Sequence, residues 1–277
     1  MMFKTIPLFF LLLTGFVYAN AQYYYKDIVS NKRLLADMDF YRENKIRAVT
    51  AKSFDDDGTE SEGFFCEKKI SRNYRKTTLF TRADIAAASE FNSEFDEDGK
   101  LLHTNDSSAL SVTDIRYNYD SKRRIRSIFS AIRSQDDDFS NNITEEHIYA
   151  YNAAGRPEKM FLVKNGKDTS EIDFATDDKG NVTIEKNTRN GAKYYYYYDS
   201  KNRLTDIVRG TDSDKRLKPD YMFEYNSAGL ITQMTSVEEG TSNYFIWKYV
   251  YDNGLRIKDN CYSDERKLMG SVEYEYK

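Results

Sequence analysis

The chain has few of the residues on which most enzyme and metal sites depend. Its 277 residues include two histidines, two cysteines, one tryptophan and three prolines. A zinc site needs three or four ligands at local spacings, and His103 and His147 are far in sequence from each other and from both cysteines. A hydrolase serine in a G-x-S-x-G turn is also missing. We therefore expect no catalytic residue, no metal ligand and no cofactor.

The two cysteines leave the redox state open. Cys66 and Cys261 stand near opposite ends of the chain. A disulfide needs Cα atoms within ~7 Å of each other, and repeat proteins usually hold their ends apart, but an oxidising compartment would permit a bond. A bridge and two free thiols are both consistent with the sequence.

The charge excludes one class of partner. Lysine and arginine number 41, aspartate and glutamate 45, and the net charge of −4 is made of mixed signs. Nucleic-acid binding needs a dense basic face, so we expect no nucleic-acid partner. After the first residues no apolar run approaches the ~18 residues of a membrane-spanning helix, so we expect no membrane span.

The first 21 residues are typical of a secretory signal peptide. Lys4 precedes an apolar run over residues 6–17, and Ala19-Asn20-Ala21 forms an A-x-A cleavage site. The apolar run is too short for a membrane anchor, and residue 22 is Gln22 where a lipoprotein has cysteine. We expect cleavage after Ala21 and a secreted or periplasmic protein.

Aromatic residues are abundant, with 23 tyrosines and 17 phenylalanines, and they recur before short turns. The clearest stretch runs from Tyr194 to Leu204. Its five consecutive tyrosines favour a strand with Tyr194, Tyr196 and Tyr198 on one face and the other two on the opposite face. Asp199 favours a tight turn, Asn202 tolerates the positive φ expected at the fourth turn position, and the chain then returns as an antiparallel strand.

Variants of this unit recur along most of the chain, with leading residues 41, 24, 32, 25, 22, 27, 26 and 25 residues apart. Such a period is the mark of a repeat array. The long first spacing leaves room for a degenerate unit around Tyr74. The leading residues are Phe54, Phe95, Tyr119, Tyr151, Thr176, Tyr198, Tyr225, Tyr251 and Tyr276.

Three places depart from the pattern. Arg123 stands where glycine or asparagine is expected, so its turn is of another type or strained. Thr176 replaces the aromatic residue. The alanine-rich run over residues 83–88 has helical propensity, which predicts a short helix or an edge insertion.

The Y-[D/N]-x-x-[G/N]-R units resemble the tyrosine–aspartate (YD) repeats of the Rhs family, over residues 95–277 and more weakly over 41–94. Arg156, Arg203 and the pair Arg124-Ile125 carry the motif after the turn. The resemblance implies long antiparallel sheets that wind into a shell or barrel. Within the family, the chain is most similar to the small secreted YD-repeat proteins of Bacteroidota. The self-cleavage segment and toxic domain of large Rhs toxins do not follow the repeats, so no toxin-delivery role is implied.

The expected number of strands predicts the same fold. Two strands per unit give ~16–20 strands, and twist makes a sheet of that size coil, close or split. We expect an all-β fold: a long antiparallel meander of hairpins that coils into a curved or barrel-like sheet, with Tyr and Phe on its inner face. The chain divides into the signal (1–21), an irregular N-terminal cap (22–53) and the repeat domain (54–277), and the cap is open between a short helix and two poor strands over residues 27–38.

Acidic clusters are the remaining candidates for chemistry, at residues 55–57, 94–98, 136–138, 177–178 and 212–214. The loop that starts at Asp96 resembles a calcium loop but has Ser107 where the bidentate acid belongs. Turn formation and solvation account for most of these acids, and a carboxylate pair of the glycosidase type is the weaker alternative.

Aromatic side chains are the best candidates for ligand binding, because exposed rings bind sugars or peptides by stacking. The alternative is cross-strand pairing inside the fold. The candidate residues are Trp247, Tyr244, Tyr249, Tyr195 and Tyr197.

The sequence favours a non-catalytic binding or structural module for a glycan or for an envelope or other partner protein. An inhibitor or immunity-type protein that caps a partner through a sheet edge is the alternative, and a carboxylate-based glycan hydrolase is a weaker one.

Overall fold

The computed structural model describes residues 22–277 except 84–85, 136–141, 212–216, 239–240 and 242. A π-helix, η1 (Tyr24–Val29), runs directly into the α-helix α1 (Ser30–Glu43). The strands that follow are β1 (Ala48–Phe54), β2 (Phe65–Ile70), β3 (Lys76–Ala83), β4 (Ala86–Phe95), β5 (Leu101–Ser108), β6 (Ser111–Tyr119), β7 (Ile125–Ser134), β8 (Asn142–Tyr151), β9 (Pro157–Lys164), β10 (Asp168–Thr176), β11 (Val182–Asn187), β12 (Ala192–Tyr198), β13 (Leu204–Thr211), β14 (Lys218–Tyr225), β15 (Ile231–Val237), β16 (Tyr244–Asp252), β17 (Leu255–Tyr262) and β18 (Leu268–Tyr276).

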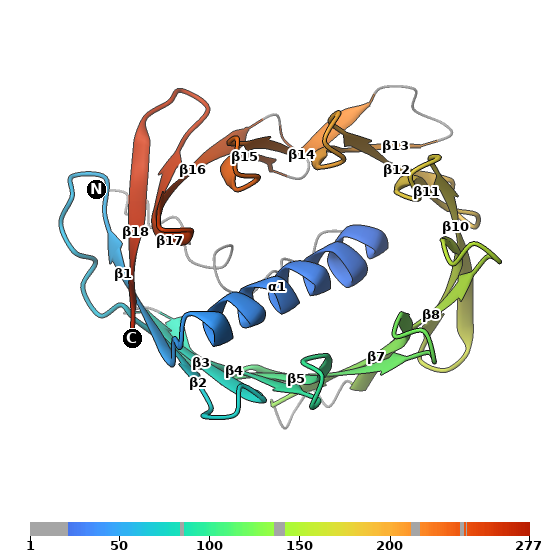
Figure 1. Ribbon diagram of the computed structural model, residues 1–277, viewed down its shortest axis with the longest axis horizontal. Coiled ribbons are helices and arrows are strands. Elements are labelled where there is room, and N and C mark those ends of the chain that lie inside the picture. The colour runs from blue at the N-terminus through green and yellow to red at the C-terminus, as the bar shows by residue number, and fades with distance from the viewer. Residues whose placement is uncertain (1–21, 84–85, 136–141, 212–216, 239–240, 242) are drawn as a thin grey trace.

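The strands form one antiparallel sheet that closes on itself. Each strand pairs with the next along the chain, and β1 also pairs with β18, with Val49 opposite Tyr276 and Phe54 opposite Ser271. Figure 1 shows the resulting ring of strands. The all-β class, the antiparallel meander, the range of 16–20 strands and the barrel-like closure expected from the sequence are confirmed.

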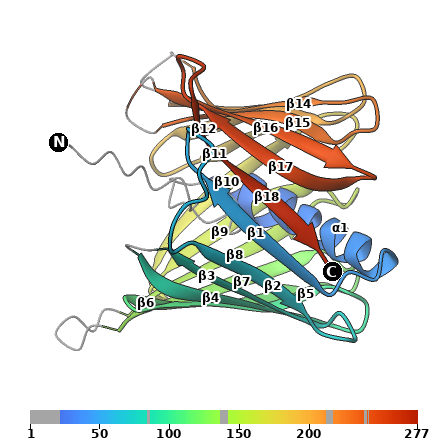
Figure 2. The ribbon, with the colours of Figure 1, turned by 90° about the vertical axis from the view of Figure 1, so that its left-hand side faces the viewer.

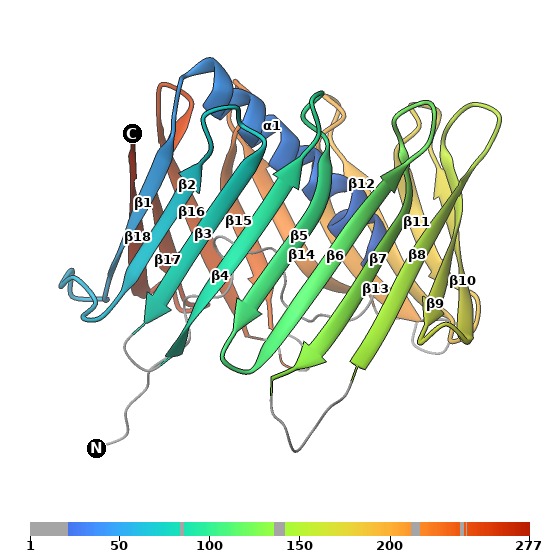
Figure 3. The ribbon, with the colours of Figure 1, turned by 90° about the horizontal axis from the view of Figure 1, so that it is seen from below.

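The helical segment lies inside the barrel, as Figures 1, 2 and 3 all show. Eight strands enclose just enough room for side chains, and barrels of 16–18 strands leave an open channel. Here residues 22–53, in which the sequence has no clear period, supply η1, α1 and most of β1. Tyr24 and Ile28 of η1 join the largest buried cluster, and Met38 of α1 joins a second one. We call η1 and α1 together the plug.

The aromatic strands alternate as expected. In β12 the side chains of Tyr194 and Tyr196 are 6% and 2% exposed, and Tyr198 packs against the same cluster. Tyr197 faces outward and is 45% exposed. The period of two along a strand therefore places one set of tyrosines against the plug and the other on the outer surface.

The repeat turns from Phe95 onward lie at one end of the barrel, because each hairpin uses two strands and returns to the same end (Figure 3). The turn after Phe54 joins β1 to β2 and lies at the opposite end. The first residue of the turn holds it closed. Asp199 accepts hydrogen bonds from the backbone N–H groups of Lys201 and Arg203, each at 2.9 Å. Asp96, Asp120 and Asp177 accept from backbone groups of their own turns in the same way.

Six of the nine leading residues are tyrosines, and each ties its strand to the hairpin before it. Its ring packs inside the barrel and its hydroxyl donates to a backbone carbonyl near the start of an earlier strand. Phe54, Phe95 and Thr176 lack a phenol and so lack this bond. We call the six bonds the tyrosine ladder: Tyr119 to Leu101 (2.8 Å), Tyr151 to Ile125 (2.7 Å), Tyr198 to Val182 (2.9 Å), Tyr225 to Leu204 (2.7 Å), Tyr251 to Ile231 (2.8 Å) and Tyr276 to Arg256 (2.7 Å).

The irregular units have physical explanations. Arg123 keeps the ordinary turn and adopts a φ of 66°, and its guanidinium pairs with Asp98. A degenerate turn does occur at Tyr74, which has a φ of 57° and donates its N–H to the Ser71 carbonyl at 2.9 Å. Of the two expectations for residues 83–88, the short helix is wrong for the described residues: Ala83 ends β3 and lies opposite Ala86 of β4, so cross-strand pairing outweighs alanine propensity. Residues 84–85 lie outside the described residues.

Both cysteines are buried free thiols. Cys66 lies in β2 and Cys261 in β17, and closure leaves β18 and β1 between them. Three inter-strand spacings of ~4.8 Å exceed the reach of a disulfide. Burial raises the pKa of Cys66 to about 11 and that of Cys261 to about 12, so neither is a ready thiolate.

The tyrosine ladder can be tested at Tyr225. Tyr225→Phe keeps the ring and removes the hydroxyl that reaches the Leu204 carbonyl. We expect the free energy of unfolding to fall by ~0.5–1.5 kcal/mol in urea titrations. Tyr197→Phe is the control, because within the described residues its outward hydroxyl has no hydrogen bond, and its effect should stay within ~0.5 kcal/mol. Equal effects of the two changes would contradict the ladder.

Candidate functional site

The inner face of the barrel carries a partly buried cluster of polar side chains around His147, which we call the His147 cluster. The imidazole Nδ1 lies 2.6 Å from Asp27 Oδ2 in η1, and Nε2 lies 2.7 Å from Glu145 Oε1 in β8. Tyr149 donates its hydroxyl to the same Asp27 oxygen at 2.8 Å. Lys164 Nζ lies 3.4 Å from the second oxygen of Glu145. The cluster joins the plug to β8 and β9.

His147 is an imidazolium in this arrangement. Two carboxylates face its two ring nitrogens, so both nitrogens must donate. Burial lowers the pKa of His147, but the charges of Asp27 and Glu145 and their hydrogen bonds outweigh burial and raise it to about 10. A histidine that keeps its proton and has both nitrogens occupied cannot act as a general base near neutral pH. The cluster therefore holds the plug in place.

A second cluster surrounds the start of the plug. Glu185 of β11 is 2% exposed, and its carboxylate accepts the N–H groups of Tyr23 and Tyr24 at 3.2 and 3.0 Å. The hydroxyl of Tyr196 donates to it at 2.8 Å. Despite these three donors, burial raises the pKa of Glu185 to about 7. Gln22 lies close by and donates its amide to Asp220 at 2.8 Å.

A third polar cluster lies in the opposite part of the interior, around the buried carboxylate of Asp259. Arg256 pairs with Asp259, lies 3.9 Å from the centre of the Tyr249 ring, and receives further support from Tyr274, which donates to Asp259 at 2.6 Å. Asp37 of α1 is exposed although it lies within the ring of strands, and the surrounding protein still raises its pKa by desolvation. Water therefore reaches part of the lumen beside the plug.

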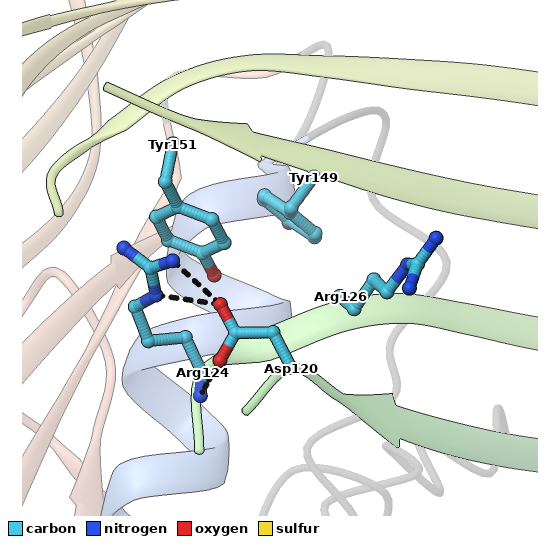
Figure 4. Close-up of a pocket in the computed structure, with 5 residues that line it drawn as sticks. All are labelled: Asp120, Arg124, Arg126, Tyr149 and Tyr151. Carbon is cyan, nitrogen blue, oxygen red and sulfur yellow. Dashed lines mark hydrogen bonds and ion pairs between the residues drawn. The ribbon is translucent and has the colours of Figure 1, made fainter. Parts of the chain in front are cut away.

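A pocket of about 250 Å³ opens between the turn after β6 and strand β8 (Figure 4). Arg124 makes two hydrogen bonds to Asp120 Oδ2, at 2.8 and 2.6 Å, and stacks 4.1 Å from the centre of the Tyr151 ring. Tyr149 and Tyr151 direct their hydroxyls to the cluster and the ladder described above. Of the five described residues that line the pocket, Arg126 alone has a charged group without a partner, so the pocket offers a ligand one cation and no nucleophile.

The acidic clusters mostly serve the turns. Asp57, Asp96 and Asp177 accept hydrogen bonds from their own turns, as expected for turn chemistry. Within the described chain no group of three or more His, Cys, Asp and Glu residues is placed to hold a metal ion. The clusters at residues 136–138 and 212–214 lie outside the described residues.

The candidate ligand-binding residues fall on opposite faces of the sheet. Trp247 and Tyr249 of β16 point into the barrel, and Trp247 is 3% exposed. Tyr244 is on the other face of β16, and Tyr195 and Tyr197 are on the outer face of β12. Three strands separate β12 from β16, so the five residues do not form one surface.

The cross-strand register of β12–β17 places Tyr197 in one row with residues that the sequence analysis did not single out. Going from β12 to β17, opposite positions are Tyr197, Asp206, Met222, Thr235, Ile246 and Tyr262. The large side chains of this row are Tyr197, Met222, Ile246 and Tyr262, and Met222 is 37% exposed, whereas Thr235 between Met222 and Ile246 is buried. We call Tyr195, Tyr197, Met222, Ile246 and Tyr262 the outer stripe. At ~4.8 Å per strand it extends over ~24 Å.

Comparison with known proteins gives only distant matches. No family model and no curated protein sequence matches it. A porin-like protein from Bacteroides uniformis has 12% identity and a TM-score of 0.38, over 84% of this chain and 98% of its own. One from Bacteroides vulgatus has 12% identity and a TM-score of 0.31 over the same shares.

A third match is to a toxin. The Photorhabdus luminescens Tc holotoxin pore, carrying a TccC3 mutation, has 12% identity and a TM-score of 0.32, over 77% of this chain and 16% of its own. Identities and scores this low carry no functional argument. Across the described residues, no helix is both long and apolar enough to pass through a lipid bilayer.

The His147 cluster makes stability depend on pH. The pKa of His147 is raised from 6.5 to about 10, so its contribution to the free energy of unfolding is full below pH ~6.5 and is lost as the pH rises through about 10. We expect His147→Gln to lower the free energy of unfolding by ~3–5 kcal/mol at pH ~6, because Asp27 and Glu145 lose their charge partner. The deficit should shrink towards pH ~10 in urea titrations.

His103 provides the matched control. It makes one carboxylate contact, to Asp114 at 2.6 Å, at a more exposed site on the barrel wall. His103→Gln should cost less than ~1 kcal/mol. A His147→Gln deficit that stays constant across this pH range would show that the imidazolium charge is not what matters.

Proposed function

We propose that this protein is a secreted or periplasmic, non-catalytic β-barrel of the YD-repeat type that binds an extended glycan across its outer face. The outer stripe is the observation that carries the proposal. Rings and apolar side chains at Tyr197, Met222 and Ile246 lie in line across five strands. Aromatic faces stack on sugar rings, and the half-buried Asp206 between them supplies a hydrogen-bonding group for hydroxyls.

The charges on the outer wall support a barrel in contact with water. A lipid-facing barrel needs an apolar outer band ~25 Å tall. Here Lys159 and Glu171 pair across β9 and β10, and on another part of the wall Lys258 pairs with Glu273 at 2.8 Å. Charged pairs at mid-strand positions would be costly in hydrocarbon. These pairs favour a soluble role in the periplasm or outside the cell.

The interior supports binding at the outer wall over catalysis in the lumen. The plug occupies the channel that an empty barrel of this size would have. His147 is held by two carboxylates and Asp120 by Arg124, so the polar groups that could serve a reaction already serve the fold. A retaining or inverting glycosidase needs two carboxylates free to face a sugar.

Closure of the barrel weakens the inhibitor alternative. Capping a partner through a sheet edge requires unpaired backbone groups on that edge. In the described strands β1 and β18 pair with each other, and no edge strand is left. A protein partner would have to bind through side chains on the wall or the loops.

The proposal predicts that Tyr197→Ala weakens glycan binding about tenfold, because one desolvated stacking contact contributes ~1.4 kcal/mol. The wild-type protein would be screened on an array of bacterial and extracellular polysaccharides, and the best ligand would be titrated by calorimetry against both forms. Tyr197 is exposed, so its loss should not unfold the barrel.

Phe65→Ala is the matched control. Phe65 is 40% exposed and lies on β2, where it contacts the Phe80 ring, away from the outer stripe. Its loss should leave glycan affinity unchanged. Retention of no glycan by the wild type, or equal losses from both changes, would overturn the proposal.

A further inference from the structure

The first described residues of the chain are deeply buried. Gln22 is 2% exposed, and Tyr23 and Tyr24 are 8% and 6% exposed. Glutamine is seldom buried, and here its side-chain amide donates to Asp220 inside the barrel. The residue that follows the expected signal cleavage site is therefore part of the core.

Glu185 lies at the same place without a cation. Its carboxylate receives two backbone N–H groups and one phenol, as described above. Across the described part of the chain, no lysine, arginine or histidine forms an ion pair with it. A buried carboxylate is costly unless a positive charge accompanies it.

We propose that the α-ammonium group of Gln22, created when the signal peptide is removed, is the missing cation, and that Glu185 is the site that holds the mature N-terminus. A signal peptidase would hydrolyse the bond between Ala21 and Gln22 with one water, leaving a carboxylate on Ala21 and an amino group on Gln22 that takes up a proton. Three covalent bonds separate this nitrogen from the Tyr23 nitrogen, which already donates to Glu185. The inference rests on cleavage after Ala21.

The surrounding charges favour a cation at this position. Burial raises the pKa of Tyr23, and the negative charges of Glu145, Glu185 and Asp27 raise it further. Asp220 accepts from Gln22 and is paired with Arg209 at 3.0 Å, and His147 lies between Asp27 and Glu145. The helix dipole opposes a cation at the start of the plug by ~0.3–1 kcal/mol, which a buried carboxylate contact exceeds.

Removal of the signal peptide would then strengthen the contact between the plug and the barrel wall. Before cleavage the Gln22 nitrogen is a neutral amide, and afterwards it is a charge inside a low-dielectric core facing Glu185. The plug would be held more tightly in the processed chain than in its precursor.

Two measurements on the secreted protein test the premise. Intact mass and N-terminal sequencing should show a chain that begins at Gln22 with a free amino group. A different first residue, or a terminal glutamine that has cyclised with loss of ammonia, would overturn the inference and would leave the glycan proposal untouched.

A second experiment tests the contact itself. A chain that starts at Gln22, released by protease from a fusion, would be compared with the same chain carrying one extra alanine before Gln22. We expect the extension to reduce the folding equilibrium constant about 10- to 100-fold in urea titrations, or ~1.4–2.8 kcal/mol. In Glu185→Gln the two forms should differ by less than about twofold.

Comparing the effect of the extension in the wild type and in Glu185→Gln distinguishes loss of the ion pair from steric crowding. An equal loss on extension in wild type and Glu185→Gln would indicate steric crowding and overturn the inference, as would no loss in either. If Glu185→Gln does not fold, the rate at which an acylating reagent modifies the Gln22 amine tests the contact in the wild-type chain. In the folded wild-type chain at neutral pH the Gln22 amine should react at least tenfold more slowly than in urea, and equal rates would overturn the inference.

Discussion

A barrel of eighteen strands cannot be filled by the side chains of its own wall, and this constraint governs the rest of the structure. In an eight-stranded barrel the inward side chains of the wall fill the interior, whereas the side chains of an eighteen-stranded wall leave a channel. The segment before β1 fills it, with Tyr24, Ile28 and Met38 packed against the inward residues of the strands. Because a helix brings a terminus and polar side chains with it, the wall must supply buried partners such as Glu185 and His147.

The sequence predicts what is local and misses what depends on closure. Asp199 and Asn202 form their turn, and Tyr194 and Tyr197 take opposite faces, because turn chemistry and strand alternation involve neighbours only. The plug is not readable as a helix with one apolar stripe, since a helix surrounded by wall buries residues on several sides, including Asn31. The alanines at 83–88 show the reverse case, where pairing with an existing strand decides the structure.

The candidate site shows the same limit. Tyr197, Met222 and Ile246 lie in one row, although they precede their turn tyrosines (198, 225 and 251) by one, three and five positions. The row shifts by two residues per hairpin because strands in a closed barrel are tilted and staggered. Sequence repeats align equivalent positions and cannot reveal this shift. The outward direction of Tyr195 and Tyr197 could therefore be predicted, but their neighbours on the outer stripe could not.

Polar contacts, more than apolar ones, explain why the plug has one position. Apolar burial is nearly indifferent to rotation or sliding of a helix within a wide tube, since it depends on area and not on direction. Hydrogen bonds and ion pairs require particular atoms to meet, and the contacts from Asp27 to His147 and from Tyr24 to Glu185 fix both the depth and the rotation of the first turns. A half-turn rotation would leave each of these carboxylates buried and unpaired, at a cost of several kcal/mol. The buried charges resemble a catalytic site, but their role is to fix one position and one rotation of the plug inside a wide barrel.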